Sequence, residues 1–128
     1  MTQQNKSIFV CEDDADSSEL LRFMFELEGY SVVACDNAEE CLEQARQDKF
    51  QAIILDNRLG NVSSVEVCQQ IRKTHPTLPI IFYSGEARRP EIDKALAAGA
   101  DDYLVKPLDF ERLLPIVAGL VKRNSRAQ

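Results

Sequence analysis

The sequence is poor in the residues that build zinc sites and disulfide frameworks. It has one histidine, His75, and four cysteines with no C-x-x-C spacing among them: Cys11, Cys35, Cys41 and Cys68. Zinc-binding and disulfide-rich domains usually show closely paired cysteines or cysteines combined with histidines. We therefore expect the cysteines to be small buried apolar residues in a reducing compartment.

Long apolar runs and an excess of positive charge are also missing. No run is long enough to cross a bilayer, and residues 1–6 lack the apolar segment of a secretion signal. The net charge is −6, whereas a nucleic-acid-binding domain needs a basic face. These absences predict a cytoplasmic protein that binds neither membrane nor nucleic acid.

The chain has no repeats, linkers or low-complexity tracts that would divide it into parts. Its 128 residues are enough for one packed core. We expect a single domain over residues 1–128, ordered over about residues 7–123. Too few residues follow the last predicted helix to form an output domain.

What the chain does contain is a series of short apolar runs, and four of them end on a reactive side chain. Ile8–Cys11 leads into Glu12 and Asp13, Ala52–Leu55 into Asp56, Ile80–Tyr83 into Ser84, and Tyr103–Val105 into Lys106. Tyr30–Cys35 is a fifth run. Short β-branched and aromatic runs of this kind predict buried parallel strands.

Helical periodicity fills the segments between the runs. We predict helices over about residues 16–28, 37–48, 62–75, 90–99 and 109–122. Gly29 ends the first of these helices and Asn37 caps the second. Pro115 falls inside the last helix and should bend or weaken it.

Strands and helices that alternate in this way predict a doubly wound α/β fold. Five strands suit a flavodoxin-like (βα)5 parallel sheet with strand order 2-1-3-4-5, in which ligands bind at the carboxyl ends of the strands. The crevice between the first and third strands would then bring Asp13 and Asp56 face to face.

The carboxylates Glu12, Asp13 and Asp56 would repel one another at this edge unless a cation lay between them. Oxygen ligands without histidine or cysteine select Mg²⁺. An aspartate beside Mg²⁺ can act as a nucleophile on phosphorus, while Ser84 and Lys106 hold the phosphoryl oxygens. Each feature alone has a plainer interpretation, namely a solvated acidic turn, a turn serine and a surface lysine.

The segment Gly99–Pro107, which reads GADDYLVKP, resembles the fifth-strand signature of the receiver domains of two-component response regulators. The resemblance, to receivers of the chemotaxis-regulator type, extends over nearly the whole chain. It implies that Asp56 is the phosphoacceptor. It also implies that Glu12 and Asp13 bind Mg²⁺ together with Asp56 and the backbone carbonyl of Arg58.

The resemblance further implies how the protein would signal. Ser84 would be the switch hydroxyl, Tyr103 the switch aromatic and Lys106 the lysine that contacts the phosphate. On propensity alone, Tyr103 is also explained as an ordinary half-buried strand residue.

A histidine kinase or phosphotransfer protein would supply the phosphoryl group. An effector would bind the face formed by the helix at 90–99, the strand at 103–105 and the helix at 109–122, and phosphorylation could also drive homodimerisation. Such a protein is not an enzyme with an external substrate, because it catalyses only its own phosphotransfer and hydrolysis.

The segment after Asp56 departs from the family pattern. Gly60 stands where receivers usually have proline, and Ser64 where they have a later glycine. Metal ligation by the Arg58 carbonyl therefore depends on how this turn is built. Arg58 and Glu86 should also stand at the mouth of the site and pair across it.

Two alternatives remain open at this point. Asp14 and Asp16 match the D-x-D start of haloacid-dehalogenase phosphatases, which would make the protein a metal-dependent phosphatase. That interpretation leaves Asp56 without a role. The other alternative is a degenerate receiver that acts only as a protein-interaction module.

Overall fold

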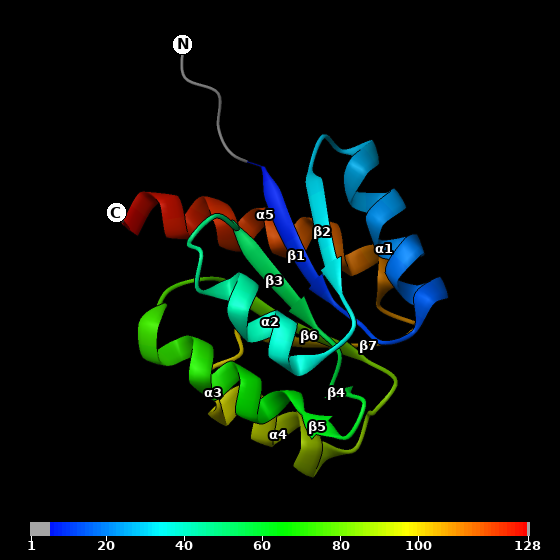
Figure 1. The fold of residues 1–128 in the computed structure, drawn as a ribbon. Coiled ribbons are helices and arrows are strands. Elements are labelled where there is room, and N and C mark those ends of the chain that lie inside the picture. Colours follow the sequence, from blue (N-terminus) through cyan, green and yellow to red (C-terminus); the bar gives the residue numbers. More distant parts are fainter. Residues whose placement is uncertain (1–5, 128) are drawn as a thin grey trace.

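Five parallel strands form the central sheet, in the order β2-β1-β3-β6-β7 (Figure 1). They are β1 (Ser7–Cys11), β2 (Ser31–Cys35), β3 (Ala52–Leu55), β6 (Ile80–Ser84) and β7 (Asp102–Val105). Counted along the chain this is the predicted order 2-1-3-4-5, so the flavodoxin-like fold is confirmed. The computed structural model describes residues 6–127. Residues 1–5, whose composition argues against a secretion signal, and residue 128 lie outside that range.

Helices cover both faces of this sheet (Figure 1). They are α1 (Ala15–Leu27), α2 (Ala38–Ala45), α3 (Ser64–Thr74), α4 (Arg89–Ala97) and α5 (Phe110–Ala127). One face of the sheet packs against α1 and α5, and the other packs against α2, α3 and α4. Within residues 6–127, no helix is both long and apolar enough to cross a membrane.

Side chains of a strand point alternately to the two faces, and this alternation divides the core in two. Phe9 of β1 belongs to the core beneath α2, α3 and α4, whereas Ile8 and Val10 belong to the core beneath α1 and α5. All three are fully buried. Because both faces are covered, the strands are apolar throughout, as the sequence predicted.

The starts of α1 and α2 follow their capping signals. The Asp14 carboxylate accepts a hydrogen bond from the Ser17 N–H at 2.9 Å, and the Asn37 side chain accepts one from the Glu40 N–H at 2.8 Å. The helix α5 contains Pro115, as predicted, but continues to Ala127, past its predicted end at residue 122.

Two further predicted helix boundaries are wrong, and the first is the start of α3. The residues after Asp56 form an antiparallel hairpin of β4 (Arg58–Leu59) and β5 (Val62–Ser63), with Gly60 in its turn at φ +64°. Val62 is therefore a hairpin residue and not a helical one. The helix starts later because the Ser63 side chain accepts a hydrogen bond from the Val65 N–H and caps it.

The second boundary is the end of α2, which stops at Ala45 and not near Asp48. Asp48 has φ +59°, in the left-handed region that ends a right-handed helix. Aspartate is one of the few residues other than glycine that adopt this conformation readily.

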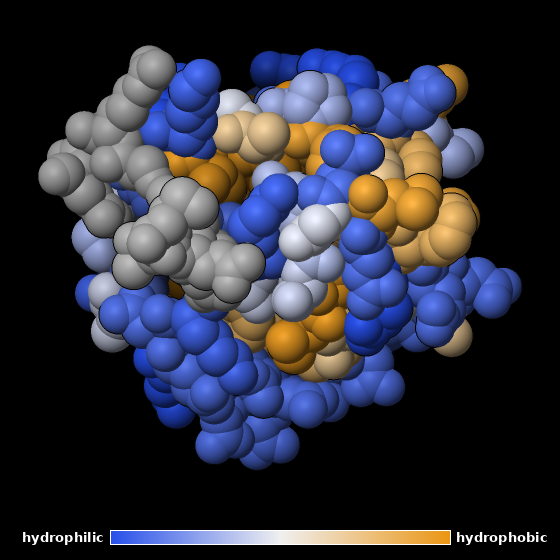
Figure 2. Space-filling view, turned by 90° about the horizontal axis from the view of Figure 1, so that it is seen from above, coloured by the Kyte–Doolittle hydropathy of each residue, from blue (hydrophilic) through white to orange (hydrophobic). Residues whose placement is uncertain are grey.

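Figure 2 shows the end of the molecule at which the strands begin, opposite the carboxyl ends where the predicted site lies. Hydrophilic side chains cover much of this end, and separate patches of apolar side chains lie among them. Scattered apolar residues are normal on a protein surface. The reactive residues of the sequence gather at the other end.

Candidate phosphoryl and metal site

Three carboxylates and one ammonium group meet where β1, β3 and β7 end. One oxygen from each of Glu12, Asp13 and Asp56 lies within 4.8 Å of the others. The Lys106 Nζ donates hydrogen bonds to Glu12 Oε1 at 2.5 Å and to Asp56 Oδ2 at 3.2 Å. The structure thus brings together four residues that the sequence placed at one edge of the sheet.

Backbone carbonyls of β1 and β2 position two of these carboxylates. The Asp56 N–H donates to the Cys11 carbonyl at 3.0 Å, and the Glu12 N–H donates to the Cys35 carbonyl, also at 3.0 Å. Both bonds extend the parallel ladders of the sheet beyond its last paired residues. The two carboxylates are therefore placed by the sheet itself.

Electrostatics in this cluster favour an added cation. Glu12 is only 3% exposed, and its burial, together with Asp56, raises its pKa to about 7 despite the bond from Lys106. Burial alone would lower the pKa of Lys106, but the two carboxylates outweigh it and raise that pKa. One lysine thus does not compensate the negative charge. The donors are all carboxylate oxygens, which fits Mg²⁺.

The hairpin after Asp56 contacts the cluster through Gly60. Its N–H donates to Asp13 Oδ2 at 3.0 Å, a contact that the sequence did not predict. The Arg58 side chain turns away and donates to the Asn61 carbonyl at 2.9 Å. The Arg58 backbone carbonyl as a metal ligand stays a prediction.

The two predicted switch residues meet at a third residue. Ser84 Oγ accepts a hydrogen bond from the Glu86 N–H at 3.2 Å, and the Tyr103 hydroxyl donates to the Glu86 carbonyl at 2.7 Å. Both side chains are buried, and the Tyr103 ring stacks on Phe82 with 5.7 Å between centroids. Nothing in the sequence indicated Glu86 as the shared partner.

This arrangement agrees with the comparison to known families. Residues 8–118 match the description "Response regulator receiver domain". The chain belongs to the response regulator receiver family. The match covers both the carboxylate cluster and the switch residues.

Two curated relatives of this receiver are the response regulator MprA of Mycobacterium leprae and the alkaline phosphatase synthesis transcriptional regulatory protein PhoP of Bacillus subtilis. The first is 36% identical over 91% of the chain, and the second is 34% identical over 96%. The receiver spans about half of each relative, 51% in both cases.

Solved structures show the same fold. A two-component response regulator from Clostridium difficile has a TM-score of 0.86 at 30% identity, over 92% of this chain and 97% of the other. A CheY-like receiver domain protein from Methanospirillum hungatei has a TM-score of 0.91 at 25% identity, over 98% and 100%. A BeF3-activated DrrB receiver domain has a TM-score of 0.84 at 26% identity, over 93% and 99%.

One expectation about the mouth of the receiver's site is wrong. Glu86 pairs with Arg88 at 2.8 Å, and this pairing lowers the pKa of Glu86 to about 2. Arg58 bonds within its own hairpin instead. Arg88 stands two residues from Glu86 on the same loop, so it forms the pair more readily than a residue on another element.

Proposed function

We propose that this receiver is a cytoplasmic phosphorylation switch that accepts a phosphoryl group on Asp56 with the help of Mg²⁺. The donor would be a phosphohistidine of a histidine kinase or phosphotransfer protein. An Asp56 oxygen forms the new bond to phosphorus as the bond from phosphorus to the histidine nitrogen breaks. The observation that carries this proposal is the Lys106 Nζ, 3.2 Å from Asp56 Oδ2 inside a cluster of carboxylates.

Each residue has a separate part in the proposed reaction. Glu12, Asp13, Asp56 and the Arg58 carbonyl would hold Mg²⁺, which when bound neutralises charge on the phosphoryl oxygens. Lys106 would leave its carboxylate partners in part and bind another phosphoryl oxygen. Positioning and charge stabilisation are the main contributions that proteins make to phosphoryl transfer.

Ser84 and Tyr103 would transmit the phosphorylated state to the surface. Ser84 would turn toward the phosphoryl group and give up its bond with the Glu86 N–H, so that the loop before α4 and the Tyr103 hydroxyl rearrange together. Such a rearrangement is a two-state element biased by a local charge. The effector would bind the α4–β7–α5 face, which could also support a homodimer.

Large exposed apolar side chains mark two surfaces for partners. Leu96 of α4 lies at the proposed effector face and is 39% exposed. On α1, Leu20, Phe23 and Leu27 are 55%, 62% and 68% exposed, and they follow helical spacing. We assign the phosphoryl donor to the α1 side, because α1 begins directly after the acidic residues of the site.

The test is intact mass after incubation with Mg²⁺ and acetyl phosphate. The wild type should gain one phosphoryl group, and chelation of Mg²⁺ should abolish the gain. Asp56→Asn should gain none, whereas Asp48→Asn, a control at an exposed aspartate outside the cluster, should label as the wild type does. Full labelling of Asp56→Asn would place the acceptor elsewhere.

The phosphatase alternative meets a geometric objection. The Asp14 carboxylate caps α1 through the Ser17 N–H, and Asp16 is exposed in the first turn of that helix. The cluster is instead formed by Glu12, Asp13 and Asp56. Turnover of free phosphomonoesters would favour the phosphatase, and a wild type that never labels would favour the degenerate receiver.

A further inference from the structure

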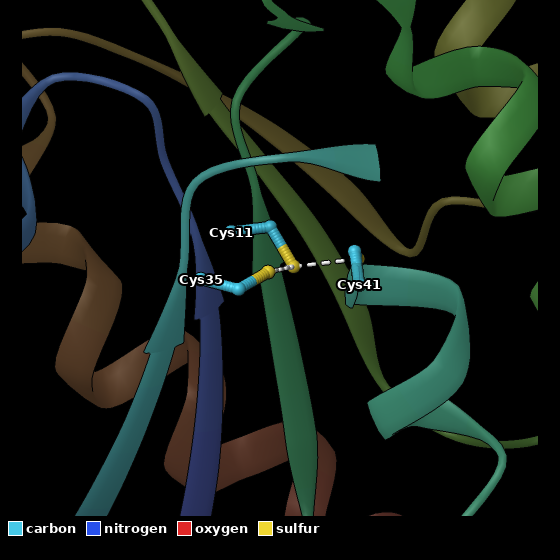
Figure 3. A group of neighbouring side chains, drawn as sticks. All are labelled: Cys11, Cys35 and Cys41. Atoms are coloured by element: carbon cyan, nitrogen blue, oxygen red, sulfur yellow. Dashed lines mark hydrogen bonds between the residues drawn. The ribbon is translucent and has the colours of Figure 1, made fainter. Parts of the chain in front are cut away.

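Three cysteine thiols from three different elements meet in the core (Figure 3). Cys11 ends β1, Cys35 ends β2, and Cys41 lies in α2. The Cys11 Sγ is 2.6 Å from the Cys41 Sγ and 3.6 Å from the Cys35 Sγ. All three sulfurs lie within 4.8 Å of one another, so they form a closed triangle.

The parallel register explains how the triangle forms. Cys11 and Cys35 are direct neighbours across the β1–β2 ladder, and their side chains point to the face that α2 covers. Cys41 lies on the buried side of α2 above them. The fourth cysteine, Cys68, is equally buried but lies in α3, where its thiol donates to the Ala98 carbonyl. It therefore serves as an internal control.

The triangle lies in the apolar core, and this limits the ions that it can hold. Cys11, Cys35 and Cys41 are 1%, 6% and 0% exposed. Three thiolates around Cu⁺ would bury two negative charges, and around Zn²⁺ they would bury one, which is costly in such a place. Zinc also takes four protein ligands in structural sites, and the described residues add no fourth His, Cys, Asp or Glu to this group. By contrast, the complex of three thiolates with a trivalent thiophilic element has no net charge.

We propose that Cys11, Cys35 and Cys41 form a binding site for trivalent arsenic, taken up as arsenious acid. Three sulfur–arsenic bonds form and three arsenic–oxygen bonds break. The three thiol protons leave with the three hydroxide groups as three water molecules. Arsenic stays trivalent, no electrons are exchanged, and the product is a neutral trithiolate.

Cys35 is the member of the triangle that borders an open pocket. This pocket has a volume of about 380 Å³. The charged residues in its wall are Glu12, Asp13, Glu19, Asp36, Glu40 and Arg22. Carboxylates outnumber the one arginine, so the pocket disfavours anions, whereas arsenious acid is uncharged at neutral pH. Cys35 would form the first bond, followed by Cys11 and then Cys41.

Occupation of the triangle should also affect the carboxylate site. The Cys11 carbonyl accepts the Asp56 N–H, and the Cys35 carbonyl accepts the Glu12 N–H, both at 3.0 Å. The backbone of two thiol residues thus positions two carboxylates. This consequence, unlike the binding itself, rests on the proposed phosphorylation of Asp56.

Binding is tested by native mass spectrometry of the reduced protein with sodium arsenite. The wild type should gain one arsenic and lose three hydrogens. Cys35→Ala and Cys41→Ala should each weaken binding at least tenfold, and Cys68→Ala should bind as the wild type does. If Cys35→Ala or Cys41→Ala bound arsenic with the affinity of the wild type, the proposed site would be wrong. It would also be wrong if the wild type bound Zn²⁺ as tightly as it binds arsenic.

X-ray absorption at the arsenic edge tests the wild type without any substitution, so a variant that fails to fold leaves the proposal testable. Three sulfur neighbours and no oxygen are expected. Two sulfurs with one oxygen would mean that the three-thiol site is wrong.

The link to Asp56 has its own measurement. Arsenite should slow labelling of the wild type by acetyl phosphate severalfold and leave the labelling rate of Cys35→Ala unaffected. Unchanged labelling of the arsenic-loaded wild type would disprove the link. A protein that binds arsenic but never labels would disprove the proposed function alone.

Discussion

At the scale of single residues, Glu12 shows how strongly position changes chemistry. A glutamate in water is ionised at neutral pH, but Glu12 is buried beside Asp56, and its pKa rises to about 7. The bond from Lys106 offsets only part of this effect. Folding therefore favours the protonated form of a residue whose proposed task requires the ionised one.

This shift predicts how stability depends on pH in the absence of Mg²⁺. The folded state binds the Glu12 proton more tightly than the unfolded state, whose pKa is about 4.5. The contribution of the bound Glu12 proton to the stability of the fold is therefore complete below about pH 4.5, and it is lost as pH rises through about 7. The free energy of unfolding should change by ~1.4 kcal/mol per pH unit at most.

The measurement is the free energy of urea unfolding at about pH 5 and about pH 8, with chelator, for the wild type and Glu12→Gln. The wild type should lose more stability over this interval than the variant. Added Mg²⁺ should restore stability at the higher pH, because it binds only the folded state. Equal losses in the two proteins would show that Glu12 titrates normally.

At the scale of elements, the hairpin and the start of α3 depart from the family pattern and carry an energetic cost. Ser64 opens α3 and is fully buried, and its Oγ has no hydrogen-bond partner among the described residues. An unsatisfied buried polar group costs about 1–3 kcal/mol. The unpaired hydroxyl of Ser64 therefore lowers the stability of the fold.

Ser64→Ala should stabilise the fold by ~1 kcal/mol or more, because it removes the unpaired hydroxyl and improves helix propensity. Ser63→Ala is the matched control. It removes the cap that accepts the Val65 N–H and should destabilise by about 0.5–2 kcal/mol. Urea unfolding of both variants measures the contrast, and a destabilised Ser64→Ala would mean that its hydroxyl is satisfied in solution.

A second element-scale prediction concerns Pro115. Proline has no N–H to donate to the Glu111 carbonyl, and a proline inside a helix costs up to ~3 kcal/mol. Pro115 is exposed, so Pro115→Ala should stabilise α5 without disturbing the core. If α5 forms the output face, the substitution should also alter partner affinity or dimerisation.

Gly119→Ala is the control for Pro115→Ala, because Gly119 is exposed in the same helix and an added Cβ meets nothing within 4 Å. It should raise the free energy of unfolding by about 0.5–1 kcal/mol through propensity alone. A Pro115→Ala variant that is less stable than the wild type would show that the proline fits a bend that the fold requires.

At the scale of the whole molecule, the site and the proposed output face are joined through one loop. Glu86 contacts Ser84 through its N–H and Tyr103 through its carbonyl. Ser84 also accepts the Lys106 N–H at 2.8 Å through its own carbonyl. Hydrogen bonds and the backbone between them therefore join the phosphoacceptor to β7 and to the loop before α4.

Beryllofluoride, a mimic of the phosphoryl group, should shift amide NMR signals of residues 84–110 more than those of residues 30–48. Tyr103→Phe removes the bond to Glu86 and should weaken the response around α4 while leaving shifts beside Asp56 intact. An even response over the whole chain would contradict the proposed route. A response confined to the carboxylates would do so as well.

The sequence alone determined the five strands of the sheet, the helices between them and the edge at which they present reactive residues. Short β-branched and aromatic runs favour buried strands, and five of them alternating with helices leave few topologies. That is why Asp13, Asp56 and Lys106 were correctly predicted to meet before any distance was known. Local sequence patterns were less informative where the backbone conformation decides at which residue a helix starts or ends, as at Val62 and Asp48.

Only the tertiary structure decided which atoms touch. Cys11, Cys35 and Cys41 meet because of the strand register and the position of α2 on the sheet. Neither of these can be read from the spacing of residues in the sequence. Glu86 pairs with its near neighbour Arg88, whose backbone N–H also donates to the Glu86 carboxylate. Charge and burial act through distance in space, so the pKa of Glu12 and the thiol triangle arise only once the chain has folded.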